Sequence, residues 1–281
     1  MAVLGMILLG IVLVFVSVGA LIYSEADANF NDTQRRLLPP SLEHPLGTDD
    51  IGRDIFARSI YGGQISILIG VAAVLVSVSL GTSIGLLSGY YGGWLDSVLM
   101  RITEAMLSIP TILLLLVMAS TFSNRIPAIQ FLGRTFSGSV VVIVLIIGAT
   151  SWMYLSRIVR SNVLSLRESE YVLAARALGA KDRRILFSHI LPNTLAPVIV
   201  AATLGVAQAI LQEAYISFLG MGVQAPTATW GNMLQESREY IDDAPWLWLV
   251  PSLLILMTVM GINFVGDGLR DAFDPRADKK V

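Results

Sequence analysis

Very few residues in this 281-residue chain could carry out metal-dependent or covalent chemistry. Cysteine is absent, and the two histidines, His44 and His189, lie 145 positions apart. A zinc protease of the His-Glu-x-x-His kind needs two histidines one helical turn apart, and a thiolate nucleophile needs a cysteine. The sequence therefore excludes a thiol enzyme and a zinc protease, predicts no metal site, and gives no indication of redox compartment.

Other catalytic classes also find no support. A phosphate-binding loop places lysine directly before serine or threonine, and the sequence does this at none of its three lysines, Lys181, Lys279 and Lys280. An aspartyl enzyme within a membrane would need paired acids, and Asp267 has no evident partner. We expect a non-catalytic chain that hydrolyses no ATP itself.

Glu213 is the one acidic residue well inside an apolar stretch, beside Gln208 and Gln212. A charge in mid-membrane costs about 2.5–3.5 kcal/mol on insertion scales, so such a residue is a candidate functional group. One interpretation is that the three side chains line a translocation path through the membrane. The alternative is a structural hydrogen bond to a neighbouring subunit or to the turn that follows at 217–220.

The composition indicates a membrane protein. Hydrophobic residues make up 54% of the chain and charged residues only 14%, with a net charge of -2. The mean hydropathy is +0.70. A soluble domain needs charged residues near a quarter of its length, and nucleic acid would require a basic surface. We therefore predict an all-α integral membrane protein without a nucleic-acid partner.

A membrane-spanning helix needs about 20 apolar residues, so we sought stretches without Asp, Glu, Lys or Arg. Six stretches qualify: 1–24, 59–95, 105–124, 135–156, 185–212 and 244–266. We expect the second helix to begin near Ile65 and fray around Gly89, and Pro110 to interrupt the third. The fifth should start after Pro192 and continue to about Leu219.

Six spans place both termini on one side of the membrane. Twelve of the 19 basic residues fall on the side that also carries the loop between the fourth and fifth spans, and seven fall on the other. The positive-inside rule makes the first side, and both termini, cytoplasmic. The expected organisation is a first transmembrane helix (1–24), an outer loop with an interfacial helix (25–61), a five-helix core (62–268) and a cytoplasmic tail (269–281).

The outer loop contains a pattern typical of a short amphipathic helix. Thr48 could cap it, and Asp49 with Arg53 and Asp54 with Arg58 have i,i+4 spacing. We predict a helix at the outer membrane interface that turns inward at 62–63, with a solvated connector helix as the alternative.

The loop at 165–193, inside the core, predicts two helices around a glycine. Helix-forming residues run from Glu168 to Leu178, and Gly179 stands where a left-handed residue ends a helix. Small residues on the first helix would let another protein's backbone approach closely. The sequence favours either a docking element or a helix resting on the lipid surface.

Several motifs together resemble one family. Ala174, Ala175 and Gly179, followed by His189-Ile190-Leu191-Pro192-Asn193, resemble the EAA loop of bacterial ABC importer permeases, which seats in the ATPase subunit. Further segments are similar to permeases of the dipeptide, oligopeptide and nickel importers: His44–Asp49 with Gly52-Arg53-Asp54, Gly92–Asp96, Ser217–Gly222 and Trp230–Leu234. The resemblance covers nearly the whole chain from His44 onward and favours the docking interpretation.

The resemblance implies a six-helix permease of the type I ABC importer kind in the inner membrane. The partners it implies are a homologous permease in a heterodimer, two ATPase subunits that bind ATP and magnesium, and an extracytoplasmic solute-binding protein. The implied cargo is a di- or oligopeptide, with nickel or another small solute as the alternative.

The resemblance also assigns residues. Those implied to couple to the ATPase are Glu170, Ala174, Ala175, Gly179, Ala180, Lys181, Asp182, Arg183 and Ile185. Trp230 and Asn232 are expected on an outer rim facing the binding protein. One position departs from the family, because Leu173 stands where glutamate is usual, which puts an ion pair there in doubt. The stretch 121–139 matches no family motif.

Overall fold

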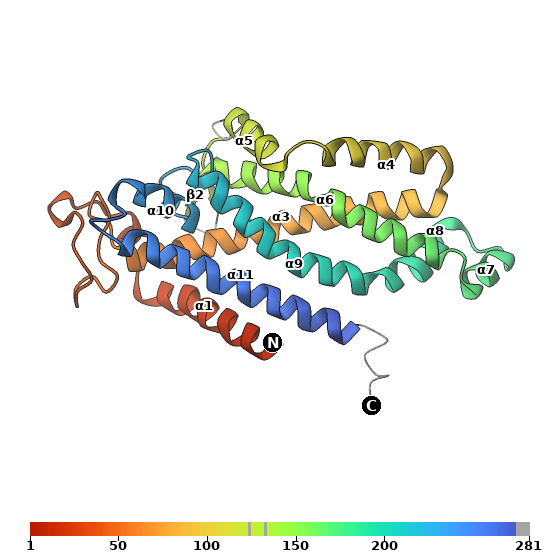
Figure 1. Ribbon diagram of the computed structural model, residues 1–281, viewed down its shortest axis with the longest axis horizontal. Coiled ribbons are helices and arrows are strands. Elements are labelled where there is room, and N and C mark those ends of the chain that lie inside the picture. Colours follow the sequence, from red (N-terminus) through yellow and green to blue (C-terminus); the bar gives the residue numbers. More distant parts are fainter. Residues whose placement is uncertain (123–124, 132–133, 274–281) are drawn as a thin grey trace.

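The computed structural model describes residues 1–122, 125–131 and 134–273, and these form a long bundle of helices (Figure 1). Part of the expected tail at 269–281, including Lys279 and Lys280, lies outside the described residues. The helices of the bundle are α1 (Ala2–Ile22), α3 (Ile55–Tyr91), α4 (Gly93–Leu107), α5 (Thr111–Phe122), α6 (Gly138–Leu166), α9 (Leu191–Phe218) and α11 (Trp246–Phe273).

Shorter elements connect these helices. They are α2 (Glu25–Asn29), a 3-10 turn (Thr33–Arg35), strands β1 (Ile129–Phe131) and β2 (Arg134–Phe136), α7 (Glu170–Ala177), α8 (Asp182–Arg184), a π-helical turn (Ile185–Ile190), α10 (Trp230–Glu236) and a 3-10 turn (Ser237–Tyr240). The stretch 121–139, which matches no family motif, contains the antiparallel strand pair β1 and β2. The predicted all-α membrane class is confirmed.

Five helices of the described chain are individually long and apolar enough to cross a membrane, and the bent pair α4 and α5 makes six. The two helices of this pair meet at 86°. Pro110 lies in the break, where its missing N–H and its ring prevent a continuous helix. The described chain therefore has five candidate spans, or six if the bent pair counts as one, and the break in this pair falls where Pro110 predicted an interruption.

The second span differs from prediction at its outer end. Helix α3 begins at Ile55, ten residues before the expected start, because the Asp54 side chain accepts a hydrogen bond from the N–H of Ala57 at 2.9 Å and caps the helix. The chain does not turn at 62–63. A Cβ on Gly63 would lie 2.5 Å from the Trp230 ring, so glycine here serves close packing within the helix.

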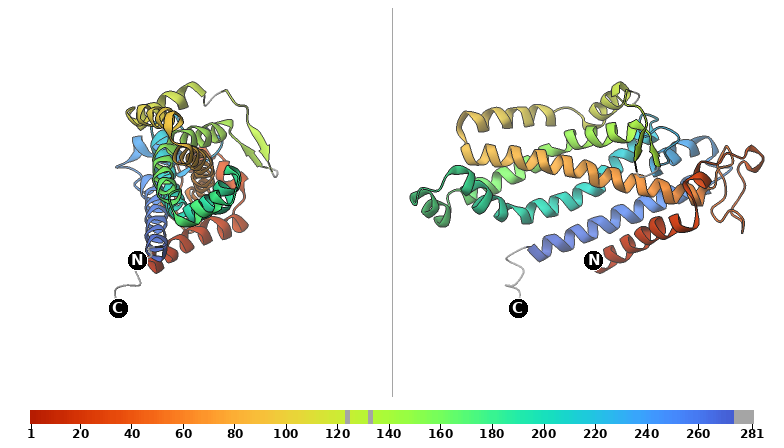
Figure 2. Two further views of the ribbon diagram at one scale, coloured as in Figure 1. Left: turned by 90° about the vertical axis from the view of Figure 1, so that its right-hand side faces the viewer. Right: turned by 180° about the vertical axis from the view of Figure 1, so that it is seen from behind.

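Helices α3 and α6 lie side by side along the bundle (Figure 2), with closely spaced glycines in the half that ends at α7. A Cβ added to Gly81, Gly85 or Gly89 would lie 2.6–2.9 Å from a backbone oxygen of α6. Small residues let helix backbones approach this closely in a membrane. Gly92, with φ +65°, then ends α3 just beyond the predicted fraying point.

The prediction of an amphipathic helix in the outer loop is wrong. Residues 48–54 form a turn closed by a bridge between Thr48 and Asp54. The Asp49 carboxylate accepts the N–H groups of Ile51 and Arg53 at 3.0 and 2.8 Å, a local alternative to helix formation. Thr48 does not cap a helix, because its hydroxyl donates to the carbonyl of Arg35 and accepts from the N–H of Leu38.

Only one of the two predicted ion pairs in this loop forms. Arg53 Nε lies 2.5 Å from Asp49 Oδ2. Asp54 instead contacts His44 Nδ1 at 2.7 Å, and Arg58 contacts Glu236 at 2.9 Å. The outer loop is thus joined to α10, a segment far along the chain.

Candidate functional site

The loop between α6 and α9 projects from one end of the bundle, opposite the outer loop (Figure 1). Helix α7 ends at Ala177, and Gly179 follows with φ +80°, which confirms the predicted left-handed glycine. After Gly179, α8 and the π-helical turn lead the chain back against the bundle. Helix α9 then begins, with a proline in its first turn. The segment is therefore a helix, a glycine turn and a second helical arm.

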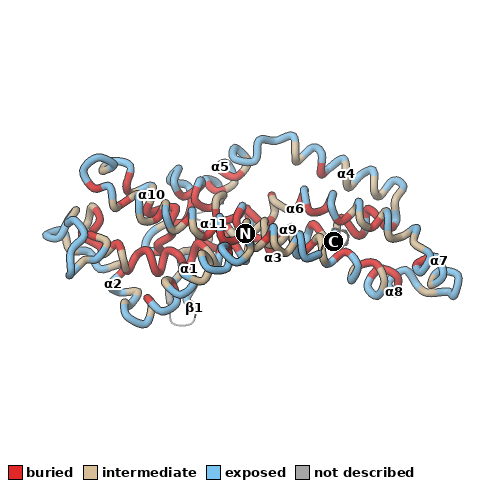
Figure 3. Tube along the Cα trace, turned by 60° about the horizontal axis from the view of Figure 1, so that its bottom comes forward, coloured by how far each residue is buried: buried red, intermediate tan, exposed pale blue. Residues whose placement is uncertain are grey.

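Most residues expected to couple to an ATPase face outward on this loop. Figure 3 shows α7 as a largely exposed segment at the end of the molecule. Six of the nine residues are exposed and two are half-buried; the exposed ones are Glu170, Ala174, Gly179, Lys181, Asp182 and Arg183. Ile185 is fully buried, so it lies beneath the outer face of the loop and is not available for direct contact with a partner.

An apolar cluster anchors the loop to the bundle. Val172 of α7 and Ile185 and Ile190 of the π-helical turn are each 0% exposed. They pack with Leu86 of α3 and Val163 of α6. The buried face of the loop therefore holds it on two of the membrane-spanning helices.

A bidentate ion pair missed by sequence analysis joins α4 to α6. Arg160 Nε and Nη2 lie 2.5 and 2.6 Å from the two carboxylate oxygens of Asp96. Ser88 of α3 hydrogen-bonds the same carboxylate. Asp96 belongs to the Gly92–Asp96 motif, but its partner lies 64 residues away, beyond any local pattern.

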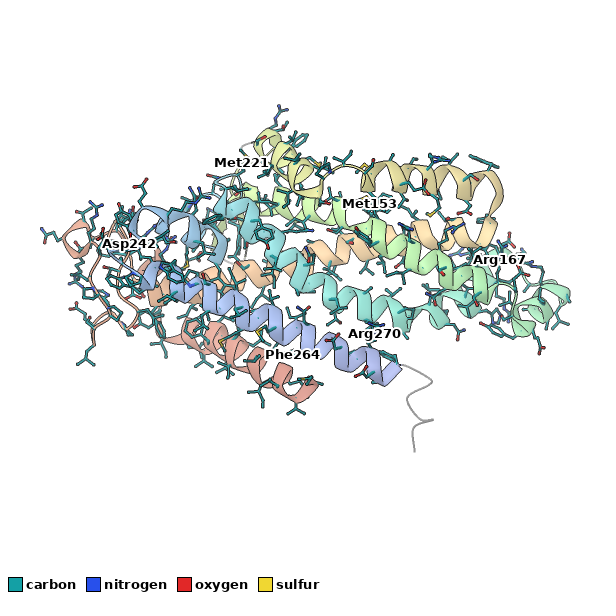
Figure 4. The ribbon with its side chains drawn as sticks, in the orientation of Figure 1. Met153, Arg167, Met221, Asp242, Phe264 and Arg270 are labelled. Carbon is teal, nitrogen blue, oxygen red and sulfur yellow. The ribbon has the colours of Figure 1, made fainter. Side chains whose placement is uncertain are left out.

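A cavity of about 670 Å³ opens among α3, α5, α6, α9 and α11. Figure 4 shows Met153, one of its lining residues, midway along the bundle between the outer loop and the projecting loop. Within the described part of the chain its lining carries no charged side chain and no histidine. The polar lining residues include Ser77, Thr150, Ser151, Gln208, Gln212 and Asn263.

Gln208 and Gln212 lie in this cavity, and Glu213 does not. Glu213 is 0% exposed. Its carboxylate accepts hydrogen bonds from Ser217 Oγ at 2.6 Å and Ser66 Oγ at 3.2 Å. Ser66 Oγ in turn accepts the N–H of Trp230 at 3.2 Å. Glu213 thus links α9 to α3 and α10, an arrangement that fits the structural interpretation of this residue.

The two residues expected on an outer rim, Trp230 and Asn232, are also buried. Trp230 is 0% exposed and donates its indole N–H to the carbonyl of Ser59 at 3.0 Å. Asn232 is 6% exposed and donates to the carbonyl of Thr227 at 2.9 Å. Since both side chains are directed into the protein, neither can form a surface for a binding protein in this conformation.

Beside α10 lies a cluster of four charged residues, Asp49, Arg53, Arg58 and Glu236. Arg53 contacts Asp49 at 2.5 Å and Glu236 at 2.7 Å. Burial opposes the charged form of Arg53, but Glu236 and Asp49 outweigh it and raise the pKa of this guanidinium. Burial, with Asp49 and Glu236 nearby, raises the pKa of the neighbouring Asp50 carboxyl.

A bundle of apolar helices around a neutral cavity, with an anchored loop projecting at one end, has the architecture of a transport permease. The chain belongs to the family described as the binding-protein-dependent transport system inner membrane component, whose profile matches residues 81–279. The resemblance to ABC importer permeases is thereby confirmed.

Named relatives cover most of the chain. The dipeptide transport system permease protein DppC of Alkalihalophilus pseudofirmus is 43% identical over 98% of this chain and 86% of its own length. A putative peptide permease of Brucella suis is 45% identical over 85% of this chain and 75% of its own. The oligopeptide permease protein OppC of Bacillus subtilis is 37% identical over 99% and 87%.

Solved structures share the fold. An inward-facing structure of the MetNI methionine ABC transporter matches with a TM-score of 0.60 and 19% identity, covering 77% of this chain and 97% of that one. An amino acid ABC transporter matches with a TM-score of 0.51 and 19% identity, covering 78% and 94%. The helical arrangement is therefore that of ABC importer permeases.

Proposed function

We propose that this chain is the permease subunit of an ATP-driven importer of di- or oligopeptides. It pairs with a homologous permease, receives cargo from an extracytoplasmic binding protein and is driven by two ATPase subunits. The relatives named as dipeptide, oligopeptide and peptide permeases support the cargo. The chain itself performs no catalysis, and both its termini lie in the cytoplasm.

The observation that carries the proposal is the projecting loop. Its outer face offers exposed small and charged residues, while its inner face is buried against α3 and α6. A surface that is exposed at one end of the bundle and rigidly attached to membrane helices suits a separate motor subunit. ATP-driven closure of the ATPases would move the loop and, with it, the helices around the cavity.

The volume and the lining of the cavity favour a peptide over nickel as the cargo. Its volume of about 670 Å³ is within the usual range for small-molecule sites, and its polar groups are hydroxyls and amides. Amide side chains can both donate to and accept from a peptide backbone. Nickel is held by imidazole, thiolate or carboxylate ligands, which the described lining lacks.

Reconstitution of the whole importer tests this function. The chain would be purified with its permease partner, ATPases and binding protein, placed in liposomes and supplied with ATP. We expect uptake of labelled di- and oligopeptides and no uptake of radioactive nickel, with a non-hydrolysable ATP analogue as the control. Nickel uptake without peptide uptake would show that nickel, and not a peptide, is the cargo. A chain that never co-purifies with an ATPase would contradict its assignment as an ATP-driven importer.

A further inference from the structure

The inner end of α3 reaches the projecting loop. This helix has 37 residues and is therefore about 55 Å long, compared with a bilayer core of about 30 Å. Its last turn contains Tyr90, which is 7% exposed, and it ends at Gly92. The last turn of a membrane-spanning helix thus lies within reach of the loop.

Tyr90 contacts both arms of the loop. Its hydroxyl donates a hydrogen bond to Asp182 Oδ1 in α8 at 2.7 Å. The guanidinium carbon of Arg176 in α7 lies 5.8 Å from the centre of the Tyr90 ring, within range of a cation–π interaction. Gly179 separates these two arms, so one side chain of α3 holds the helix before the glycine and the helix after it.

The remaining attachments of the loop are mostly apolar. Val172, Ile185 and Ile190 pack into the bundle, and such contacts resist separation without fixing direction. The hydrogen bond from Tyr90 to Asp182 is directional and involves a charged acceptor, which makes it stronger than a neutral one. It therefore restricts the orientation of the α8 arm relative to α3 more than the apolar contacts do.

Helix α3 is closely packed against α6. The two helices touch at Gly81, Gly85 and Gly89, where added methyl groups would collide with α6. Arg167, at the loop end of α6 in Figure 4, also donates from Nη1 to the carbonyl of Gly89 at 3.1 Å. Both α3 and α6 line the cavity, so displacement of Tyr90 would move two of its walls.

We propose that Tyr90 is a positioning residue that passes movement of the projecting loop to α3 and so to the cavity. This role rests on the proposed coupling to an ATPase. Tyr90 itself is buried and is not among the residues that line the cavity. Its hydroxyl holds Asp182, and Asp182 lies on the exposed arm of the loop.

The test compares Tyr90→Phe with Tyr91→Phe in the reconstituted importer. Tyr91 is the adjacent residue, is 51% exposed, and has its ring 5.1 Å from that of Tyr90. The readout is the number of peptides imported per ATP hydrolysed, with retention of the ATPase during purification measured alongside. We expect this ratio to fall about three- to tenfold in Tyr90→Phe, the scale of one lost hydrogen bond, and to stay unchanged in Tyr91→Phe.

A second variant, Asp182→Asn, removes the charged acceptor of the same hydrogen bond. If the hydrogen bond carries the effect, Asp182→Asn lowers the ratio as well, and the double variant is no worse than the poorer single variant. An unchanged ratio in Tyr90→Phe, or fully additive losses, would overturn the role. Loss of the ATPase from Tyr90→Phe complexes would assign the residue to docking and also overturn it. If the unmodified complex imports no peptide with ATP, that result contradicts the proposed function itself and not only the role of Tyr90.

Discussion

The Glu213 carboxylate accepts a 2.6 Å hydrogen bond from the hydroxyl of Ser217, one turn further along α9. The same carboxylate accepts from Ser66 of α3, so a buried acid holds two spans together. Replacing Glu213 with alanine leaves both hydroxyls without this acceptor and opens a gap. We expect a loss of about 1–3 kcal/mol in stability, seen as a lower unfolding temperature of the purified complex.

For the neighbouring residue Gln212 we expect an effect on transport and not on stability. It lines the cavity and accepts a hydrogen bond from Ser151 at 3.3 Å. The double variant Gln208→Ala with Gln212→Ala should assemble normally but import peptides about three- to tenfold more slowly, because amide contacts with the backbone are lost. Gln34→Ala, at an exposed position outside the cavity, is the control. Normal uptake by the double variant would remove these residues from the substrate path.

The pair formed by Arg160 and Asp96 should stabilise the packing of α4 against α6. Arg160→Lys replaces a planar two-point contact with a single ammonium, so we expect a loss of about 1–2 kcal/mol. Arg101→Lys is the matched control, because Arg101 is 85% exposed in its pair with Glu104. That change should alter stability by less than about 0.5 kcal/mol. Equal unfolding temperatures for the two variants would contradict the assignment.

Close packing of α3 on α6 predicts a strong difference between two glycines. A Cβ at Gly85 would lie 2.6 Å from the carbonyl oxygen of Ser156, whereas a Cβ at Gly10 meets nothing within 4 Å. Gly85→Ala should destabilise the protein by about 1–3 kcal/mol through overpacking. Gly10→Ala should be neutral or slightly stabilising. Thermal unfolding in detergent distinguishes them, and similar effects at both positions would exclude the close approach.

The outer charged cluster predicts that Glu236 is needed for stability. Arg58 has 2% of its side chain exposed and contacts Glu236 at 2.9 Å, while its distance to Asp49 is 3.7 Å. Glu236→Gln leaves a buried guanidinium poorly compensated, with an expected loss of about 1–3 kcal/mol. Glu239→Gln, at an exposed acid three residues later, should have little effect. Comparable unfolding midpoints for the two variants would show that the cluster is not stabilising.

Local patterns in the sequence predicted the membrane class, the six spans and the loop with Gly179. Each follows from neighbouring residues: the length of an apolar stretch sets a span, proline interrupts a helix, and glycine adopts a positive φ. The same local rules gave the wrong result at 48–58. Charges with i,i+4 spacing favour a helix, but the Asp49 side chain binds backbone N–H groups and makes a turn instead.

The sequence by itself determined the helical membrane class and the permease family, and it predicts a docking role for the loop with Gly179. Only the tertiary structure decided which polar residues face the cavity and which are buried. Gln212 and Glu213 are adjacent in sequence, yet one lines the cavity and the other is fully buried. The reason is that burial depends on which helix packs against each face, and the partners of Glu213 and Arg58 lie up to 178 residues away.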